Sequence, residues 1–103
     1  LWLSLCMAKI KKRSGSGNYL HLQFFCPACK ELHQINAVVG PPVENGPWGF
    51  NGDFETPTIA PSIRVKYGKE TCHSFVEGGN IRFCSDSTHA MAGKTVPLPE
   101  VNE

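Results

Sequence analysis

The stretch CHSFVEGGNIRFCSD, Cys72–Asp86, carries the clearest β-hairpin pattern in the chain. Polar and apolar residues alternate on both sides of a central Gly-Gly pair, which supplies the positive φ angles of a tight two-residue turn. A pairing of Glu77 with Asn80 would set the register of this hairpin. Because consecutive residues of a strand point to opposite faces, we expect Cys72 and His73 on opposite sides of the sheet.

That register has a consequence for the second face of the hairpin. His73 would lie opposite Cys84, with Phe75 opposite Arg82, and Asp86 would follow on the same side. His73 is then a partly exposed side chain beside a carboxylate. The sequence contains no recognisable nucleophile–base set, so His73 and Asp86 are named only as candidate catalytic residues.

Other segments predict further strands, a loop and one helix. Alternation favours strands over Tyr19–Phe25, His33–Val39 and Ser62–Tyr67. Five prolines and four glycines over residues 40–62 indicate a long ordered loop. The segment SDSTHAMAGK, Ser85–Lys94, has the punctuation of a short helix, since Asp86 or Ser87 could cap it and Gly93 suits its end. We therefore expect an α+β fold, mostly antiparallel β: a small zinc-ribbon-like domain with one short C-terminal helix.

The 103 residues are a length that suits one domain. Charge is unevenly distributed along them. Four of the ten basic residues lie together near the start, whereas the chain from residue 14 onward has six basic and nine acidic residues. We expect a flexible basic leader over residues 1–18, with Met7 as the natural start, and a single zinc-stabilised β-rich domain over residues 19–103. The main part of the chain is therefore not basic, whereas nucleic-acid-binding domains typically are. The basic residues of the leader are Lys9, Lys11, Lys12 and Arg13.

Cysteine usage points to metal binding. Five cysteines is an odd number, and no apolar run is long enough for a secretory leader or a membrane span. A reduced, cytoplasmic setting without membrane association is therefore expected, in which cysteines bind metal. Cys84 is interpreted as a small apolar residue, and His21 as a surface residue.

The stretch FFCPACKELH contains the spacing of a zinc knuckle. Cys26 and Cys29 are separated by two residues, and a tight turn of this kind brings two thiolates to one ion. A redox pair or a chance spacing are the alternatives, but the strand–helix–strand context of a redox motif is missing. A closed site needs four ligands. We predict a Zn²⁺ site formed by Cys26, Cys29, Cys72 and His89, with His33 and His73 as alternates.

Four blocks resemble a small uncharacterised family that is common in tailed phages and prophages. They are CPAC…H, WGFNGDFETPTIAPSI, CHSFVEGGNIRF and DSTHAMAGKTVPLP, and the resemblance extends over Tyr19–Pro99. Some members carry the label ammonia monooxygenase, a membrane-embedded copper enzyme, which does not suit so short a chain without a membrane span. One departure is Ser87, where the family frequently has cysteine. The resemblance draws attention to Cys26, Cys29, His33, Trp48, Asn51, Gly52, Pro57, Thr58, Pro61, Ser62, Cys72, His73, Asp86, His89 and Gly93.

Three functions remain open at this point. The sequence favours a zinc-stabilised binding module rather than an enzyme, and the resemblance implies a phage origin and contact with a host or phage protein. A zinc-dependent hydrolase that uses His73, His89 and Asp86 around an open metal is the alternative. A nucleic-acid-binding zinc ribbon, with the basic leader as its contact, is the second alternative.

Overall fold

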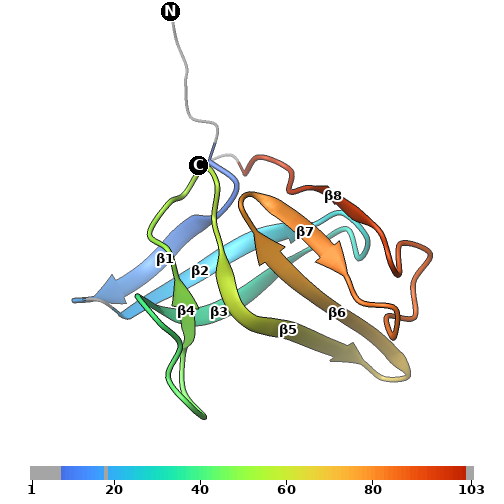
Figure 1. Cartoon of the computed structure of the whole chain (residues 1–103), viewed down its shortest axis with the longest axis horizontal. Coiled ribbons are helices and arrows are strands. Elements are labelled where there is room, and N and C mark those ends of the chain that lie inside the picture. The colour runs from blue at the N-terminus through green and yellow to red at the C-terminus, as the bar shows by residue number, and fades with distance from the viewer. Residues whose placement is uncertain (1–7, 18, 102–103) are drawn as a thin grey trace, which may run out of the picture.

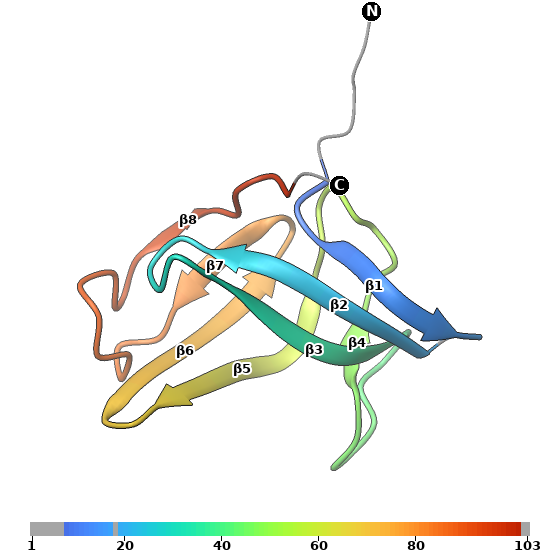
Figure 2. The same cartoon turned by 180° about the vertical axis from the view of Figure 1, so that it is seen from behind.

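The computed structural model describes residues 8–17 and 19–101. These residues form a single β-sheet of eight strands, which follow one another across the sheet in sequence order (Figures 1 and 2). The strands are β1 (Lys11–Ser16), β2 (Tyr19–Cys26), β3 (Glu31–Val39), β4 (Trp48–Phe50), β5 (Ile59–Tyr67), β6 (Glu70–Glu77), β7 (Asn80–Phe83) and β8 (Thr95–Pro97).

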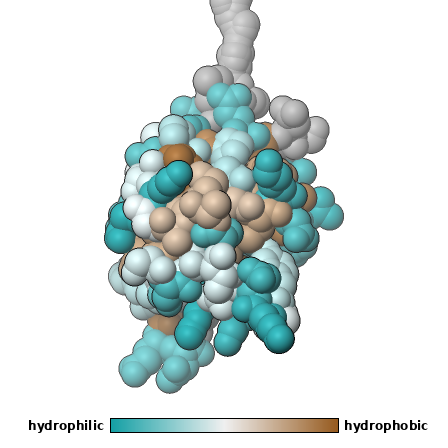
Figure 3. All heavy atoms as spheres, turned by 90° about the vertical axis from the view of Figure 1, so that its right-hand side faces the viewer, coloured by the Kyte–Doolittle hydropathy of each residue, from teal (hydrophilic) through white to brown (hydrophobic). Residues whose placement is uncertain are grey.

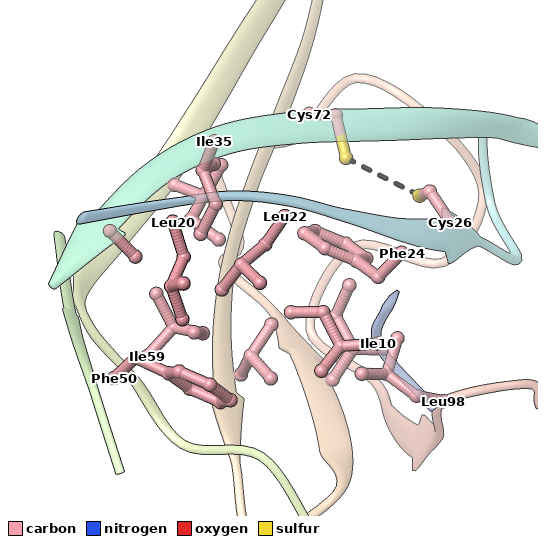
Figure 4. Close-up of a cluster of buried hydrophobic side chains, with 14 of the residues drawn as sticks. Ile10, Leu20, Leu22, Phe24, Cys26, Ile35, Phe50, Ile59, Cys72 and Leu98 are labelled. Carbon is pink, nitrogen blue, oxygen red and sulfur yellow. Dashed lines mark hydrogen bonds between the residues drawn. The ribbon is translucent and has the colours of Figure 1, made fainter. Parts of the chain in front are cut away.

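The sheet curls so that its two halves face each other. Neighbouring strands are antiparallel except for β3 and β4, which are parallel. The three-residue β4 is the bridge between the halves, because it pairs with β3 on one side and with β5 on the other. In Figures 1 and 2, β1–β3 and β5–β7 cross each other on opposite sides of the molecule. Buried side chains from both halves form the core between them, among them Leu22, Phe24, Ile59 and Cys72 (Figure 4).

The structure has the hairpin register that the sequence indicates. Glu77 pairs with Asn80 and Phe75 pairs with Arg82, and both turn glycines have positive φ angles. Burial alternates along β6, so that Cys72 is buried whereas His73 is half-buried. The two neighbours therefore point to opposite faces, one toward the interior and one toward the outer surface.

The predicted α+β fold with a C-terminal helix is wrong, because the described residues form strands and turns only. Between β7 and β8, backbone groups that a helix would use are bonded elsewhere. The Thr88 N–H donates to the Thr71 carbonyl of β6, and the Ser87 hydroxyl bonds to the backbone of His73. The segment therefore follows β6 as a series of turns, a consequence of tertiary hydrogen bonds that local helix propensity does not reveal. Within the described residues, no helix is long and apolar enough to span a membrane.

Part of the segment expected to be a flexible leader is ordered. Residues 11–16 form β1, which pairs with β2, and Ile10 is fully buried in the core. Three of the four basic residues noted above lie at the start of this strand. Residues 1–7, including Met7, lie outside the described residues. The sequence did not indicate this burial, because a single isoleucine before a basic run forms no periodic pattern. The residues that Ile10 packs against come together only in the folded sheet.

This arrangement predicts that the segment before Tyr19 contributes to stability. Ile10→Ala removes a fully buried side chain and is expected to lower the free energy of unfolding by about 2–5 kcal/mol. Lys12→Ala, an exposed position two residues away, is the matched control and should cost no more than about 0.5 kcal/mol. Urea unfolding of both variants measures the difference. Equal midpoints for the two variants would show that β1 is not part of the folding unit.

Candidate functional site

Four metal-ligating side chains meet at one end of the sheet. The ligand atoms of Cys26, Cys29, His33 and Cys72 all lie within 4.8 Å of one another. Cys26 ends β2, Cys29 lies in the turn to β3, and the other two come from β3 and β6. The turn is tight because the Lys30 N–H donates to the Cys26 carbonyl at 2.8 Å, and Lys30 adopts a positive φ of 59°. This cluster could hold a metal ion.

The electrostatics of the cluster fit a cation. The sulfurs of Cys26 and Cys72 are 3.8 Å apart (Figure 4), and this contact lowers the pKa of Cys26 far below its usual value. The same contact, together with burial, raises the pKa of Cys72. One thiolate is thus stabilised next to thiols that keep their protons. His33 is 4% exposed and its Nε2 has no hydrogen-bond partner, an arrangement that costs free energy unless another group satisfies that nitrogen.

Three of the four ligands predicted from the sequence belong to this cluster, together with His33, which was an alternate. His89, the fourth predicted ligand, is not part of this cluster. Its ring packs edge-on against Phe83 at 4.7 Å, and its Nδ1 accepts the Met91 N–H at 3.2 Å. His89 instead lines a cavity of about 310 Å³ beside Cys29 and Cys72. Figure 3 shows this end of the molecule, where brown apolar surface is surrounded by hydrophilic residues.

A second constellation lies on the opposite, outer face of β5 and β6. The His73 ring connects two side chains. Its Nδ1 lies 3.0 and 3.1 Å from the two carboxylate oxygens of Asp86, and its Nε2 lies 2.8 Å from the hydroxyl oxygen of Ser62. A hydroxyl, an imidazole and a carboxylate in this order are the parts of a Ser-His-Asp triad. Both hydrogen bonds have the length required for proton transfer without rearrangement.

The positions of these three residues follow from strand pairing. His73 pairs with Arg64 of β5, so Ser62 lies two residues farther along the same strand, on the same face. Asp86 lies in the turn after β7. The Cys84 N–H at the start of this turn donates to the His73 carbonyl at 2.8 Å, and this hydrogen bond holds the turn next to His73. The Trp48 indole N–H donates to the Ser62 carbonyl at 3.1 Å and fixes the backbone of the hydroxyl-bearing residue.

Ser87 holds the backbone of His73 in place. Its hydroxyl oxygen accepts the His73 N–H and the hydroxyl donates to the His73 carbonyl, both at 3.0 Å. Ser87 is 8% exposed, so water does not readily replace these bonds. A buried serine that binds both backbone groups of a histidine is a positioning residue for that histidine.

Ser87→Ala is therefore expected to destabilise the protein and to misplace the His73 ring. Loss of both bonds leaves a backbone N–H buried without a partner, which costs about 1–3 kcal/mol. Ser85→Ala, an exposed serine two residues earlier, should change the stability by no more than about 0.5 kcal/mol. Chemical denaturation gives the stability of each variant. Identical unfolding curves for Ser85→Ala and Ser87→Ala would contradict the positioning role.

Ser62 is the member of this constellation that residue patterns alone do not identify. Serine is frequent in strands and turns, and nothing in SIRVKY distinguishes it. The missing signal is the pairing of β5 with β6, which follows from the tight turn at Gly68 and Lys69 between them. Extending that register places Ser62 beside His73. The family resemblance also drew attention to Ser62, His73 and Asp86, without assigning them roles.

Comparison with known proteins gives a match to a protein family. The family model described as BubE, the bacterial ubiquitination-like system serine protease, matches residues 7–84. The matched range contains Ser62, His73 and the four residues that could hold a metal ion, and Asp86 lies two residues beyond it. Neither a curated protein nor a solved structure matches the chain. Because the match covers more than half of the sequence, the chain belongs to the BubE family.

Proposed function

We propose that this protein is a serine protease in which Ser62 is the nucleophile, His73 the general base and Asp86 the residue that orients and stabilises the imidazole. The observation that carries this proposal is the continuous hydrogen-bonded arrangement from the Ser62 hydroxyl through both ring nitrogens to the carboxylate. The family to which the chain belongs is described as a serine protease, which agrees with this chemistry.

The geometry supports a two-step acyl transfer. The Ser62 oxygen attacks the carbonyl carbon of the substrate while its proton moves to His73 Nε2. The carboxylate of Asp86 accepts the Nδ1–H bond and stabilises the imidazolium that forms. His73 then gives its proton to the leaving amine, and the acyl group remains on Ser62. Water, deprotonated by the same nitrogen, hydrolyses the ester and restores the serine.

An open strand edge next to Ser62 supports a polypeptide substrate. β4 pairs with β5 only at Ile59 and Ala60, and beyond these residues no described strand pairs with that edge of β5. Residues on an unpaired edge offer N–H and C=O groups to an added strand. The Ser62 carbonyl already accepts the Trp48 indole N–H, so an added strand would bond to the residues of β5 that follow Ser62. An extended peptide that binds there would run past the Ser62 hydroxyl. The extended C-terminal segment of a ubiquitin-like protein is a substrate of this kind.

The metal cluster supports the site without taking part in the reaction. Three thiolates and one imidazole form the tetrahedral set of a closed structural zinc site, and we assign Zn²⁺ to Cys26, Cys29, His33 and Cys72. Cys72 and His73 are adjacent on β6, so a zinc bound on the inner face would fix the strand that presents His73 on the outer face. A zinc hydrolase built on His73, His89 and Asp86 is less well supported, because His89 lies beside Phe83 and outside both clusters of possible ligands.

Cleavage of a fusion protein tests this function. The substrate is a ubiquitin-like protein of the bacterial ubiquitination-like system, with a reporter peptide joined to its C-terminus by a peptide bond. We expect the protein to release the reporter, and Ser62→Ala and His73→Ala to abolish the release while retaining the fold. Cleavage that continues in folded Ser62→Ala protein would reject Ser62 as the nucleophile.

A further inference from the structure

Three ligand-type side chains lie on the outer face, apart from the Cys26 cluster. The Cys84 sulfur, one ring nitrogen of His73 and a carboxylate oxygen of Asp86 all lie within 4.8 Å of one another. Ligands of one tetrahedral zinc ion are roughly 3.4–3.8 Å apart, so small side-chain rotations would bring these atoms to one ion. We propose that His73, Cys84 and Asp86 form a second, inhibitory zinc site, in which the proposed catalytic histidine is a ligand of the metal.

The surroundings permit entry and binding of an ion. The side chain of Asp86 is 58% exposed and that of His73 is 23% exposed, so solvent reaches both. The hydrogen bond from the Cys84 N–H to the His73 carbonyl holds the two residues opposite each other. A site with three protein ligands leaves a position for water, and is expected to bind more weakly than the four-ligand cluster.

The charges of the ligands neutralise a divalent ion. A thiolate from Cys84 and the carboxylate of Asp86 balance Zn²⁺, and the thiol proton leaves to solvent. Arg82 is the neighbouring cation. Its Nε forms an ion pair with a Glu77 carboxylate oxygen at 3.6 Å, and its guanidinium carbon lies 4.4 Å from the centre of the Phe75 ring. The thiolate ligand selects a soft or borderline metal such as Zn²⁺ over Mg²⁺ or Ca²⁺.

Binding of the metal and general-base catalysis exclude each other. Nδ1 is the ring nitrogen that faces Asp86, and it would be the ligand atom. A neutral imidazole whose Nδ1 binds a metal carries its one proton on Nε2. Nε2 would then donate a hydrogen bond to Ser62 and could not accept the proton of the hydroxyl. This inhibitory consequence rests on the proposed function, whereas the metal site itself does not.

A phosphonate probe that reacts with activated serines provides the first measurement. Protein that already carries one equivalent of zinc is titrated with zinc chloride, and the labelling rate is followed. We expect saturating zinc to slow labelling at least tenfold, and Mg²⁺ to have no effect. Cys84→Ser should label at the wild-type rate without added zinc and need at least tenfold more zinc for half-inhibition. His21→Ala, which removes an exposed histidine elsewhere, should behave as wild type.

A second measurement separates the metal site from the protease proposal. Ser62→Ala cannot be labelled but keeps all three ligands, so a second equivalent of cobalt should produce an additional thiolate-to-cobalt absorption band. The double variant with Cys84→Ser should lack that band. If the band forms but wild-type protein never reacts with the phosphonate, the metal site stands and the triad proposal fails. Half-inhibition of Cys84→Ser at the wild-type zinc concentration, or an absent second band in Ser62→Ala, would overturn the inhibitory site.

Discussion

Ser62→Ala is expected to lower the rate of substrate cleavage by roughly 10⁴-fold or more, because it removes the hydroxyl that would form the acyl intermediate. Asp86→Asn should also lower kcat by roughly 10³–10⁴-fold with little change in KM, since the amide no longer stabilises the imidazolium. Both effects are measured by steady-state cleavage of the reporter fusion, with zinc content and melting temperature recorded for each variant.

The matched control for Ser62 is Ser85→Ala, which removes an exposed hydroxyl from the segment that carries Asp86. It should leave kcat/KM unchanged within about twofold, because its side chain makes no hydrogen bond to the triad. Comparable losses in Ser62→Ala and Ser85→Ala would mean that the activity does not depend on this hydroxyl in particular. In that case the hydrogen bond between Ser62 and His73 would have only a structural role.

Removal of the proposed structural zinc is the second large effect expected. Binding of zinc to a site of this kind contributes about 10 kcal/mol or more to folding, whereas a small domain has a net stability of roughly 5–15 kcal/mol. Cys26→Ser, which removes a fully buried sulfur, should therefore yield a largely unfolded protein without bound zinc. A strong chelator should have the same effect on the wild type. Circular dichroism and elemental analysis give the fold and the metal content.

Cys84→Ser is the matched control for this substitution, because it makes the same chemical change at a cysteine outside the four-residue cluster. It should retain one equivalent of zinc and a melting temperature close to that of the wild type. A folded Cys26→Ser protein, or a wild-type melting curve that a chelator does not change, would contradict a structural role for the metal.

The features that could be predicted from the sequence are those that depend on short-range patterns. The two-residue glycine turn set the register of β6 and β7, and with it the opposite orientations of Cys72 and His73. The CPAC spacing indicated a metal ligand pair because a single tight turn places both sulfurs. The structure contains a cluster with Cys26 and Cys29 that could hold a metal ion.

The features that could not be predicted depend on contacts between distant segments. The helix expected over Ser85–Lys94 is replaced by turns because Ser87 and Thr88 bond to β6, 14 and 17 residues away. His33 and His89 could not be ranked as ligands without the curl of the sheet. The phage origin, the cytoplasmic location and the binding-module role remain predictions.

The identity of the residue that reacts with the phosphonate probe tests the central claim most directly. Intact-mass analysis should show one adduct per wild-type chain, and peptide mapping should place it on Ser62. Labelling should be lost in Ser62→Ala and be strongly reduced in His73→Ala, with both proteins folded and loaded with zinc. An adduct on another residue, or undiminished labelling of folded His73→Ala protein, would contradict a nucleophile activated by His73 and Asp86.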